Sequence, residues 1–69
     1  MKLICREQVI SEKRASGILL YVLEDGSTWS LVDEPTFIAL DRDVEVYKDG
    51  KNHYLQFSGS KTKYLVDAR

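Results

Sequence analysis

The sequence predicts an all-β fold, a single small antiparallel meander of five or six strands. Residue types that favour strands (Val, Ile, Thr, Tyr, Phe and Trp) provide 20 of the 69 residues, whereas alanine, the best helix former, occurs three times. Two pairs, Asp25-Gly26 and Asp49-Gly50, each lie between two strand-like runs, which is a strong signal for a β-hairpin. Ser58-Gly59-Ser60 marks a third turn.

The chain length indicates one domain, residues 1–69, with a small core. A chain of 69 residues is shorter than the roughly 100 to 200 residues of an average domain, and a core of this size leaves little stability for a large preorganised catalytic cavity. The longest apolar run, Ile18–Leu23, is too short to cross a membrane. Arg6 and Glu7 interrupt the N-terminal apolar residues before a secretory signal can develop. We therefore expect a cytoplasmic protein, or the mature form of a longer one, with no membrane partner.

The first half of the chain predicts three strands. Lys2–Ile10 is the expected opening strand, and Ser11–Ser16 is expected to be a charged loop. Ile18–Glu24 and Ser27–Val32 then form a hairpin around Asp25-Gly26, in a type I′ turn with two loop residues.

The register of this hairpin predicts a barrel. With a two-residue loop, Val22 faces Trp29 and Leu20 faces Leu31 on a wholly apolar side, while the opposite side is mixed. A strand that is apolar on both faces is usually covered on both sides. In so short a chain, a small closed barrel, SH3-like or OB-like in general appearance, meets this need more readily than two stacked sheets. A covering helix is the competing solution.

Two alternatives remain open for residues 34–40. Asp33-Glu34-Pro35-Thr36 could cap a short helical turn that runs through Leu40, with the proline in the first turn. The same residues could equally form a loop that leads to the next strand. Beyond them, Val44–Lys48 and His53–Ser58 form the second hairpin, and Thr62–Val66 is the last strand.

Alternation assigns the two faces of the second hairpin. Val44 and Val46 share a core face with His53, Leu55 and Phe57. The opposite face carries the aromatic side chains most exposed to solvent, with two polar neighbours: Tyr47, Tyr54, Glu45 and Gln56. The predicted core of the whole protein is Leu20, Trp29, Leu31, Val44, Val46, Leu55 and Phe57.

Three stretches resemble a pattern in small uncharacterised bacterial β-proteins. The pattern is a DGS-x-W hairpin, a G-D-x-V-type strand and a Y-x-L-x-N strand. Its counterparts here are Asp25–Trp29, Asp43–Val46 and Tyr54–Phe57. Arg42 replaces the glycine and Phe57 replaces the asparagine, so the resemblance is partial and covers about half of the chain. It implies a small bacterial β-domain and no particular activity.

No signature of catalysis or of a cofactor occurs, and we expect a non-enzymatic protein without cofactor or metal. The sequence has no Gly-rich phosphate loop, nucleophile elbow or pair of histidines at ligand spacing. His53, the only histidine, is expected to be structural, and Cys5, the only cysteine, a small buried hydrophobe. Asp41, Asp43 and Glu45 could hold a hard cation from one face of an extended strand. We interpret them as a solvated face, because the calcium-loop pattern lacks its glycine.

Charge is segregated along the chain. The net charge is +2 over residues 1–23, −6 over residues 24–45 and +3 over residues 46–69, and it is −1 for the whole chain. Since consecutive segments of a meander are neighbours in space, an acidic side and a basic side are expected. The alternative interpretation is that both signs of charge only keep a small domain soluble.

These patterns favour a protein-interaction module of bacterial or phage origin. Its predicted contact surface centres on two tyrosines with lysines at the rim: Tyr47, Tyr54, Lys48, Lys61 and Lys63. The partner would be another protein or a second copy of the chain. Binding of single-stranded nucleic acid to the same rings and lysines is the less favoured alternative, because the sequence pI of about 5.7 is low for a nucleic-acid binder.

Overall fold

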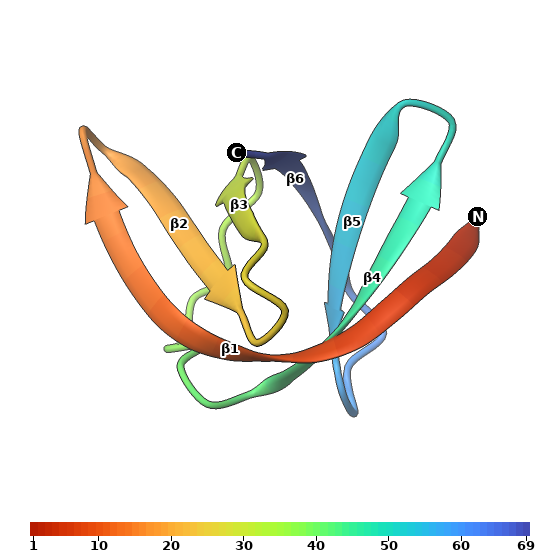
Figure 1. Cartoon of the computed structure of the whole chain (residues 1–69), viewed down its shortest axis with the longest axis horizontal. Coiled ribbons are helices and arrows are strands. Elements are labelled where there is room, and N and C mark those ends of the chain that lie inside the picture. The colour runs from red at the N-terminus through yellow and green to blue at the C-terminus, as the bar shows by residue number, and fades with distance from the viewer.

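Six antiparallel strands close into a barrel in the computed structural model, which describes all residues from 1 to 69. The strands are β1 (Lys2–Ala15), β2 (Ile18–Leu23), β3 (Thr28–Leu31), β4 (Asp43–Asp49), β5 (Asn52–Phe57) and β6 (Lys63–Ala68). Around the barrel they follow the order β1-β2-β3-β6-β5-β4, and β4 pairs with β1 to complete the circle (Figure 1). The predicted all-β fold with a small barrel is therefore confirmed.

The barrel consists of two three-stranded meanders, β1–β2–β3 and β4–β5–β6. They are joined by β4 against β1 and by β6 against β3, where Trp29 pairs with Ala68 and Leu31 with Val66. The segment between β3 and β4 connects the two meanders and contains no helix. Of the two alternatives for residues 34–40, the loop is therefore correct and the helical turn is wrong. No helix in the structure is long and apolar enough to span a membrane.

β1 is longer than predicted, because the supposed charged loop after Ile10 continues the strand to Ala15. The first half of β1 pairs with β4 and the second half with β2. Its register shifts twice, between Leu3 and Cys5 and between Val9 and Ser11. An extra residue in one strand bends that strand and increases its twist, and β1 accordingly curves along the whole lower side of the barrel in Figure 1.

The register of the first hairpin differs by one residue from the prediction. Tyr21 pairs with Trp29 and Leu20 with Ser30. The reason is the turn: Gly26 has a φ of 86°, whereas Asp25 is absent from the positive-φ residues, so a type I′ turn does not form. The amide of Gly26 donates to the carbonyl of Leu23 at 2.9 Å, which leaves a longer loop with glycine at the left-handed position. Leu20 consequently lies on the outer face.

The second hairpin has the predicted faces. Val44 pairs with Phe57 and Val46 with Leu55 on the inner side. Its turn consists of Gly50 and Lys51, because the residues that flank them, Asp49 and Asn52, still pair. The glycine has a φ of 62° and occupies the first turn position, where type II′ turns require it.

The core contains six of the seven predicted residues, and Leu20 is the exception. Tyr21 replaces it at the centre and packs edge-on against Phe57, with ring centroids 6.3 Å apart. The twelve buried apolar residues are Val9, Leu19, Tyr21, Leu23, Trp29, Leu31, Ala39, Val44, Val46, Leu55, Phe57 and Val66.

The connection between β3 and β4 also packs on the core. Phe37 meets Phe57 edge-to-face at 4.9 Å, and Ala39 is fully buried. The amide of Ala39 donates to Glu12 Oε1 at 2.7 Å. Two further backbone hydrogen bonds join the bend of β1 at Val9 to residues 41 and 42. This connection, residues 32–42, therefore packs against the barrel in a fixed position, and we call it the strap.

Candidate functional site

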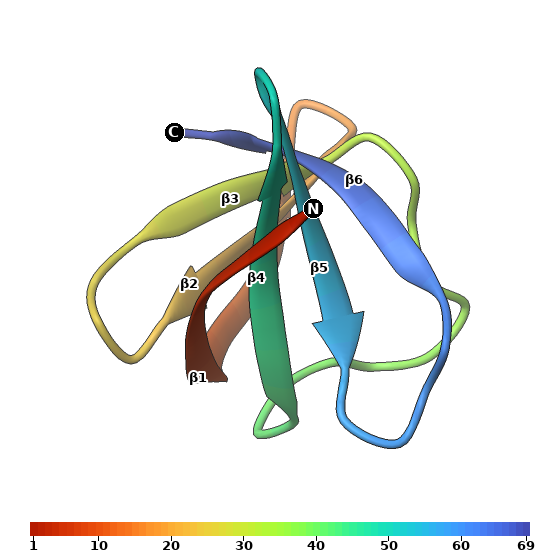
Figure 2. The ribbon, with the colours of Figure 1, turned by 90° about the vertical axis from the view of Figure 1, so that its right-hand side faces the viewer.

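The outer face of β4, β5 and β6 carries two aromatic side chains, one aliphatic side chain and one lysine. We call this surface the tyrosine face and define it as Tyr47, Tyr54, Leu65 and Lys63. Antiparallel pairing brings them together: Tyr47 lies opposite Tyr54, and Tyr54 lies opposite Leu65. Both tyrosines are half-buried. The three strands lie side by side in Figure 2, which views the molecule from this side. None of these side chains belongs to the buried core.

Lys63 is the lysine that the structure places against a tyrosine. Its Nζ lies 5.1 Å from the centroid of the Tyr47 ring, within the range of a cation–π contact. Lys63 is exposed, and none of the ion pairs in the structure includes it. The lysine therefore adds positive charge directly over the aromatic surface.

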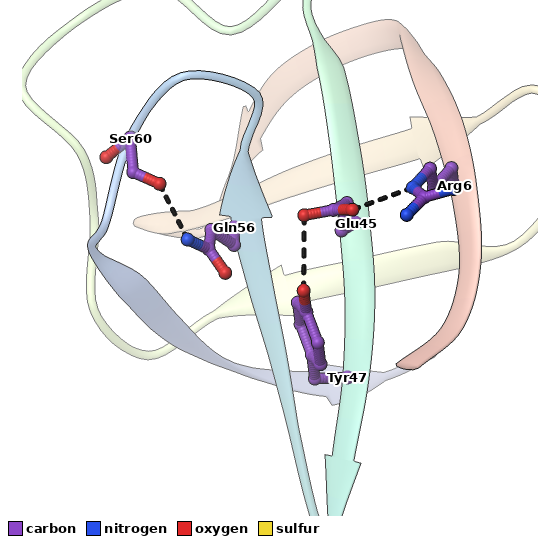
Figure 3. Close-up of polar contacts among 5 residues, drawn as sticks. All are labelled: Arg6, Glu45, Tyr47, Gln56 and Ser60. Atoms are coloured by element: carbon purple, nitrogen blue, oxygen red, sulfur yellow. Dashed lines mark hydrogen bonds and ion pairs between the residues drawn. The ribbon is translucent and has the colours of Figure 1, made fainter. Parts of the chain in front are cut away.

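An ion pair at the margin of the tyrosine face fixes Tyr47. Arg6 Nε donates to Glu45 Oε2 at 2.7 Å, and the Tyr47 hydroxyl donates to Glu45 Oε1 at 3.2 Å (Figure 3). The hydrogen bond from Arg6 lowers the pKa of Glu45, and partial burial raises the pKa of Tyr47, as does the bond to Glu45. Glu45 is thus ionised and matched by Arg6 at neutral pH, so the carboxylate leaves little free negative charge beside the rings.

The other two predicted rim lysines lie elsewhere. Lys48 pairs with His53 on the inner side of the β4–β5 hairpin, at its exposed end, so it points away from Tyr47. Lys61 is exposed in the turn between β5 and β6. That turn is held near the tyrosine face because Gln56 Nε2 donates to the Ser60 carbonyl at 2.6 Å (Figure 3). Of the three lysines, the structure brings only Lys63 into contact with a predicted tyrosine.

Two parts of this surface were not predicted from the sequence. Leu65 joins the tyrosines only through the β5–β6 register, and Arg6 reaches Glu45 only through the pairing of β1 with β4. The alternation of residues 63–67 could have suggested that Leu65 shares a face with Lys63. No local signal indicates which residue of β1 lies opposite Glu45, because that pairing spans 39 residues.

The other candidate residues do not assemble a chemical site. His53 packs its ring on Trp29 at 5.1 Å, in agreement with a structural role. Asp41 has a φ of 69° and precedes β4, so Asp41, Asp43 and Glu45 do not form the single extended strand face that a cation-binding row would need. Glu45 is moreover occupied by Arg6.

A different group of possible ligands lies near the bend of β1. Ligand atoms of Cys5, Glu7 and Asp25 lie within 4.8 Å of one another. Burial raises the pKa of the Cys5 thiol, and the two carboxylates raise it further, so the thiol stays protonated at neutral pH. Nearby, Glu7, Glu24 and three other polar residues line an open cavity of about 180 Å³. The carboxylates make this end of the barrel acidic.

Comparison with known proteins gives no relative. No protein-family model, no curated protein and no solved structure matches the chain. The candidate site therefore rests on the geometry of the barrel alone.

Proposed function

We propose that the protein is a non-enzymatic protein-interaction module that binds a partner through the tyrosine face. The observation that carries this proposal is the pairing of Tyr47 with Tyr54 on the outside of a closed barrel, next to Leu65. The core is complete without these rings. Tyrosine provides a large contact area at low cost in side-chain entropy, and it is enriched among the residues that dominate binding energies. A bacterial or phage origin and a cytoplasmic location belong to the same proposal.

The charge around the tyrosine face favours an acidic partner surface. Glu45 is matched by Arg6, whereas Lys63 lies over the Tyr47 ring without a carboxylate partner. Exposed charges at the rim of an interface mainly accelerate association and select the partner. We therefore expect a protein partner that presents carboxylates around an apolar or aromatic centre.

The test is a pair of double variants used as bait in native lysate. Tyr47→Ser/Tyr54→Ser removes both rings, and Tyr47→Phe/Tyr54→Phe is the matched control that keeps the contact area. We expect the serine variant to lose a specifically captured protein while it melts close to wild type, because neither ring belongs to the core. The phenylalanine variant should retain the capture. Loss of stability with capture intact would make the rings structural and contradict the proposal.

A titration with a mixed single-stranded oligonucleotide pool separates a protein partner from nucleic acid. Phosphate contacts give an affinity that falls steeply with salt concentration. We expect no saturable binding to the pool. Strong, salt-dependent binding that the serine double variant abolishes would instead assign the tyrosine face to single-stranded nucleic acid and overturn the proposal of a protein partner.

A further inference from the structure

The β1–β2 turn and the C-terminus lie at the same end of the barrel (Figure 1). Residues from both line an apolar groove. It has a volume of about 250 Å³, and we define the apolar groove by the residues that line it: Ala15, Ser16, Ile18, Leu20 and Arg69. Ile18, a large aliphatic residue at the start of β2, is 38% exposed. The groove therefore exposes aliphatic surface that the fold itself does not cover.

Cations flank this groove. The Nε of Arg69 donates to the Ser30 hydroxyl at 3.0 Å, which fixes the guanidinium beside the groove, and Arg69 takes part in no ion pair. Lys13 lies directly across from Leu20 on the same outer face and is likewise without a carboxylate partner. The nearest carboxylate by register is Asp67, opposite Ser30. The groove thus has an aliphatic floor, and the charged groups around it are the cations of Lys13 and Arg69 and the carboxylate of Asp67.

The opposite end of the barrel carries the complementary surface, which we call the acidic knob and define as Ile38, Leu40, Asp41 and Asp43. The segment before β4 runs along the lower end in Figure 1. Ile38 is 72% exposed and Leu40 is 45% exposed, and both aspartates are exposed as well. Hydrogen bonds from Asp41 to β1 and from Gln8 to the Asp41 carbonyl hold the knob in place.

Arg42 lies between the two aspartates of the knob in the sequence and is itself exposed, so its charge offsets part of theirs. The Arg42 guanidinium lies over the Phe37 ring, 4.5 Å from its centroid, and its Nε donates to the Ile38 carbonyl at 3.1 Å. The neighbouring cavity adds the carboxylates of Glu7 and Glu24 and the guanidinium of Arg6 to this end. The knob therefore presents aliphatic side chains beside carboxylates, whereas the apolar groove presents aliphatic side chains beside cations.

We propose that the acidic knob of one molecule docks in the apolar groove of a second copy. The two surfaces differ, so the contact is heterologous and leaves a free knob at one end and a free groove at the other, which allows open head-to-tail chains. The groove is lined by only five residues, so we expect weak association, with a dissociation constant between roughly 10 μM and 1 mM. Rising salt weakens it, because the charges are exposed.

The test blocks each surface separately in the full chain and measures the mass of the assemblies by sedimentation velocity. The protein concentration is raised to roughly 2 mM, because the expected affinity is weak. Ile18→Glu places a carboxylate in the groove, and Ile38→Lys places a cation on the knob. We expect wild type to form concentration-dependent oligomers and each variant alone to stay monomeric. An equimolar mixture of the two should form a dimer that does not grow, because one intact knob and one intact groove remain.

Ile4→Glu is the matched control, since Ile4 is 49% exposed and lies on neither surface, and it should associate as wild type does. Arg69→Gln provides a second groove variant without a change in a strand, and it should weaken association. Tyr47→Ser/Tyr54→Ser should leave self-association unchanged, which separates this proposal from the one for the tyrosine face. A monomeric wild type, a mixture that stays monomeric, or an equal effect of Ile4→Glu would each overturn the proposal.

Discussion

Tyr21 is the residue on which the centre of the barrel depends. Its backbone pairs with β1 and β3, and its side chain is fully buried in the core. Its hydroxyl is the one buried side-chain polar atom without a hydrogen-bond partner. An unpaired buried hydroxyl costs free energy, because it has lost its hydrogen bonds to water and gained none. We therefore expect the ring of Tyr21, and not its hydroxyl, to contribute to stability through packing.

Replacing Tyr21 with phenylalanine tests this account. At neutral pH we expect Tyr21→Phe to leave the free energy of unfolding unchanged or to raise it by about 1 kcal/mol, measured by urea denaturation. Tyr54→Phe, on the outer face, is the control. A loss of more than about 1 kcal/mol would show that the hydroxyl has a bound partner, such as a buried water molecule.

Alkaline pH gives a second readout of the same variant. Burial, the largest cause, raises the pKa of Tyr21 far above its usual value, and Glu12 raises it further. Between the unfolded pKa of about 10 and the higher folded value, the unfolded chain has lost the proton and the folded chain has kept it. Stability therefore falls as pH rises above about 10, by up to about 1.4 kcal/mol per pH unit for this one group. Tyr21→Phe should make that decline less steep; an unchanged slope would contradict the assignment.

Most residues of the core could be predicted from the sequence, but the residue at its centre could not. Trp29, Val46 and Phe57 lie on faces that alternation assigns correctly. Leu20 and Tyr21 are neighbours, and both faces of β2 are largely apolar, so alternation alone could not decide which of them is buried. The length of the turn determines which of the two is buried, because one extra loop residue shifts the pairing by one position and changes the cross-strand partners.

At the scale of elements, the strap between β3 and β4 depends on one carboxylate of β1. Glu12 Oε1 accepts the hydrogen bond from the amide of Ala39, which is fully buried. Glu12→Ala leaves that amide without a partner, and we expect it to lower the free energy of unfolding by about 1 to 3 kcal/mol. Amide hydrogen exchange at Ala39 should accelerate at the same time.

Glu12→Gln is the matched control, because its side-chain carbonyl can still accept the hydrogen bond. It should stay closer to wild type in both stability and exchange. Equal losses in the alanine and glutamine variants would indicate that the negative charge, and not the hydrogen bond, holds the strap.

The strap and the second half of β1 are the two elements whose structure the sequence did not predict. Most of residues 11–15 are polar or charged, which is typical of a loop, yet they belong to β1 because β2 pairs with them as far as Ala15. The turn follows at Ser16 and Gly17, with φ values of 53° and 79°. Pro35 with its preceding acidic residues is compatible with either a helix start or a loop. Contacts of Phe37 and Ala39 with the core decide for the loop.

For the whole molecule, the fold distributes the charge blocks of the sequence over both ends of the barrel. The acidic block of residues 24–45 contributes Glu24 and Asp43 to the cavity where β1 bends, together with the cation Arg6. Glu34 of the same block instead pairs with Arg14, which also donates to the Gly17 carbonyl in the β1–β2 turn. The segregation that the sequence predicts is therefore partial, and the position of each charge depends on pairings between distant segments.

The closure of the barrel supports both proposed surfaces, because Tyr54 meets Leu65 and Arg69 reaches Ser30 only when β6 lies between β3 and β5. Nuclear Overhauser effects across the strands measure it most directly in isotope-labelled protein. We predict backbone contacts of Trp29 with Ala68 and of Leu31 with Val66, together with contacts of Glu7 with Val44 across the β1–β4 seam. A spectrum with β3 paired to β4 and no contact between β3 and β6 would contradict the closed barrel and both surfaces built on it.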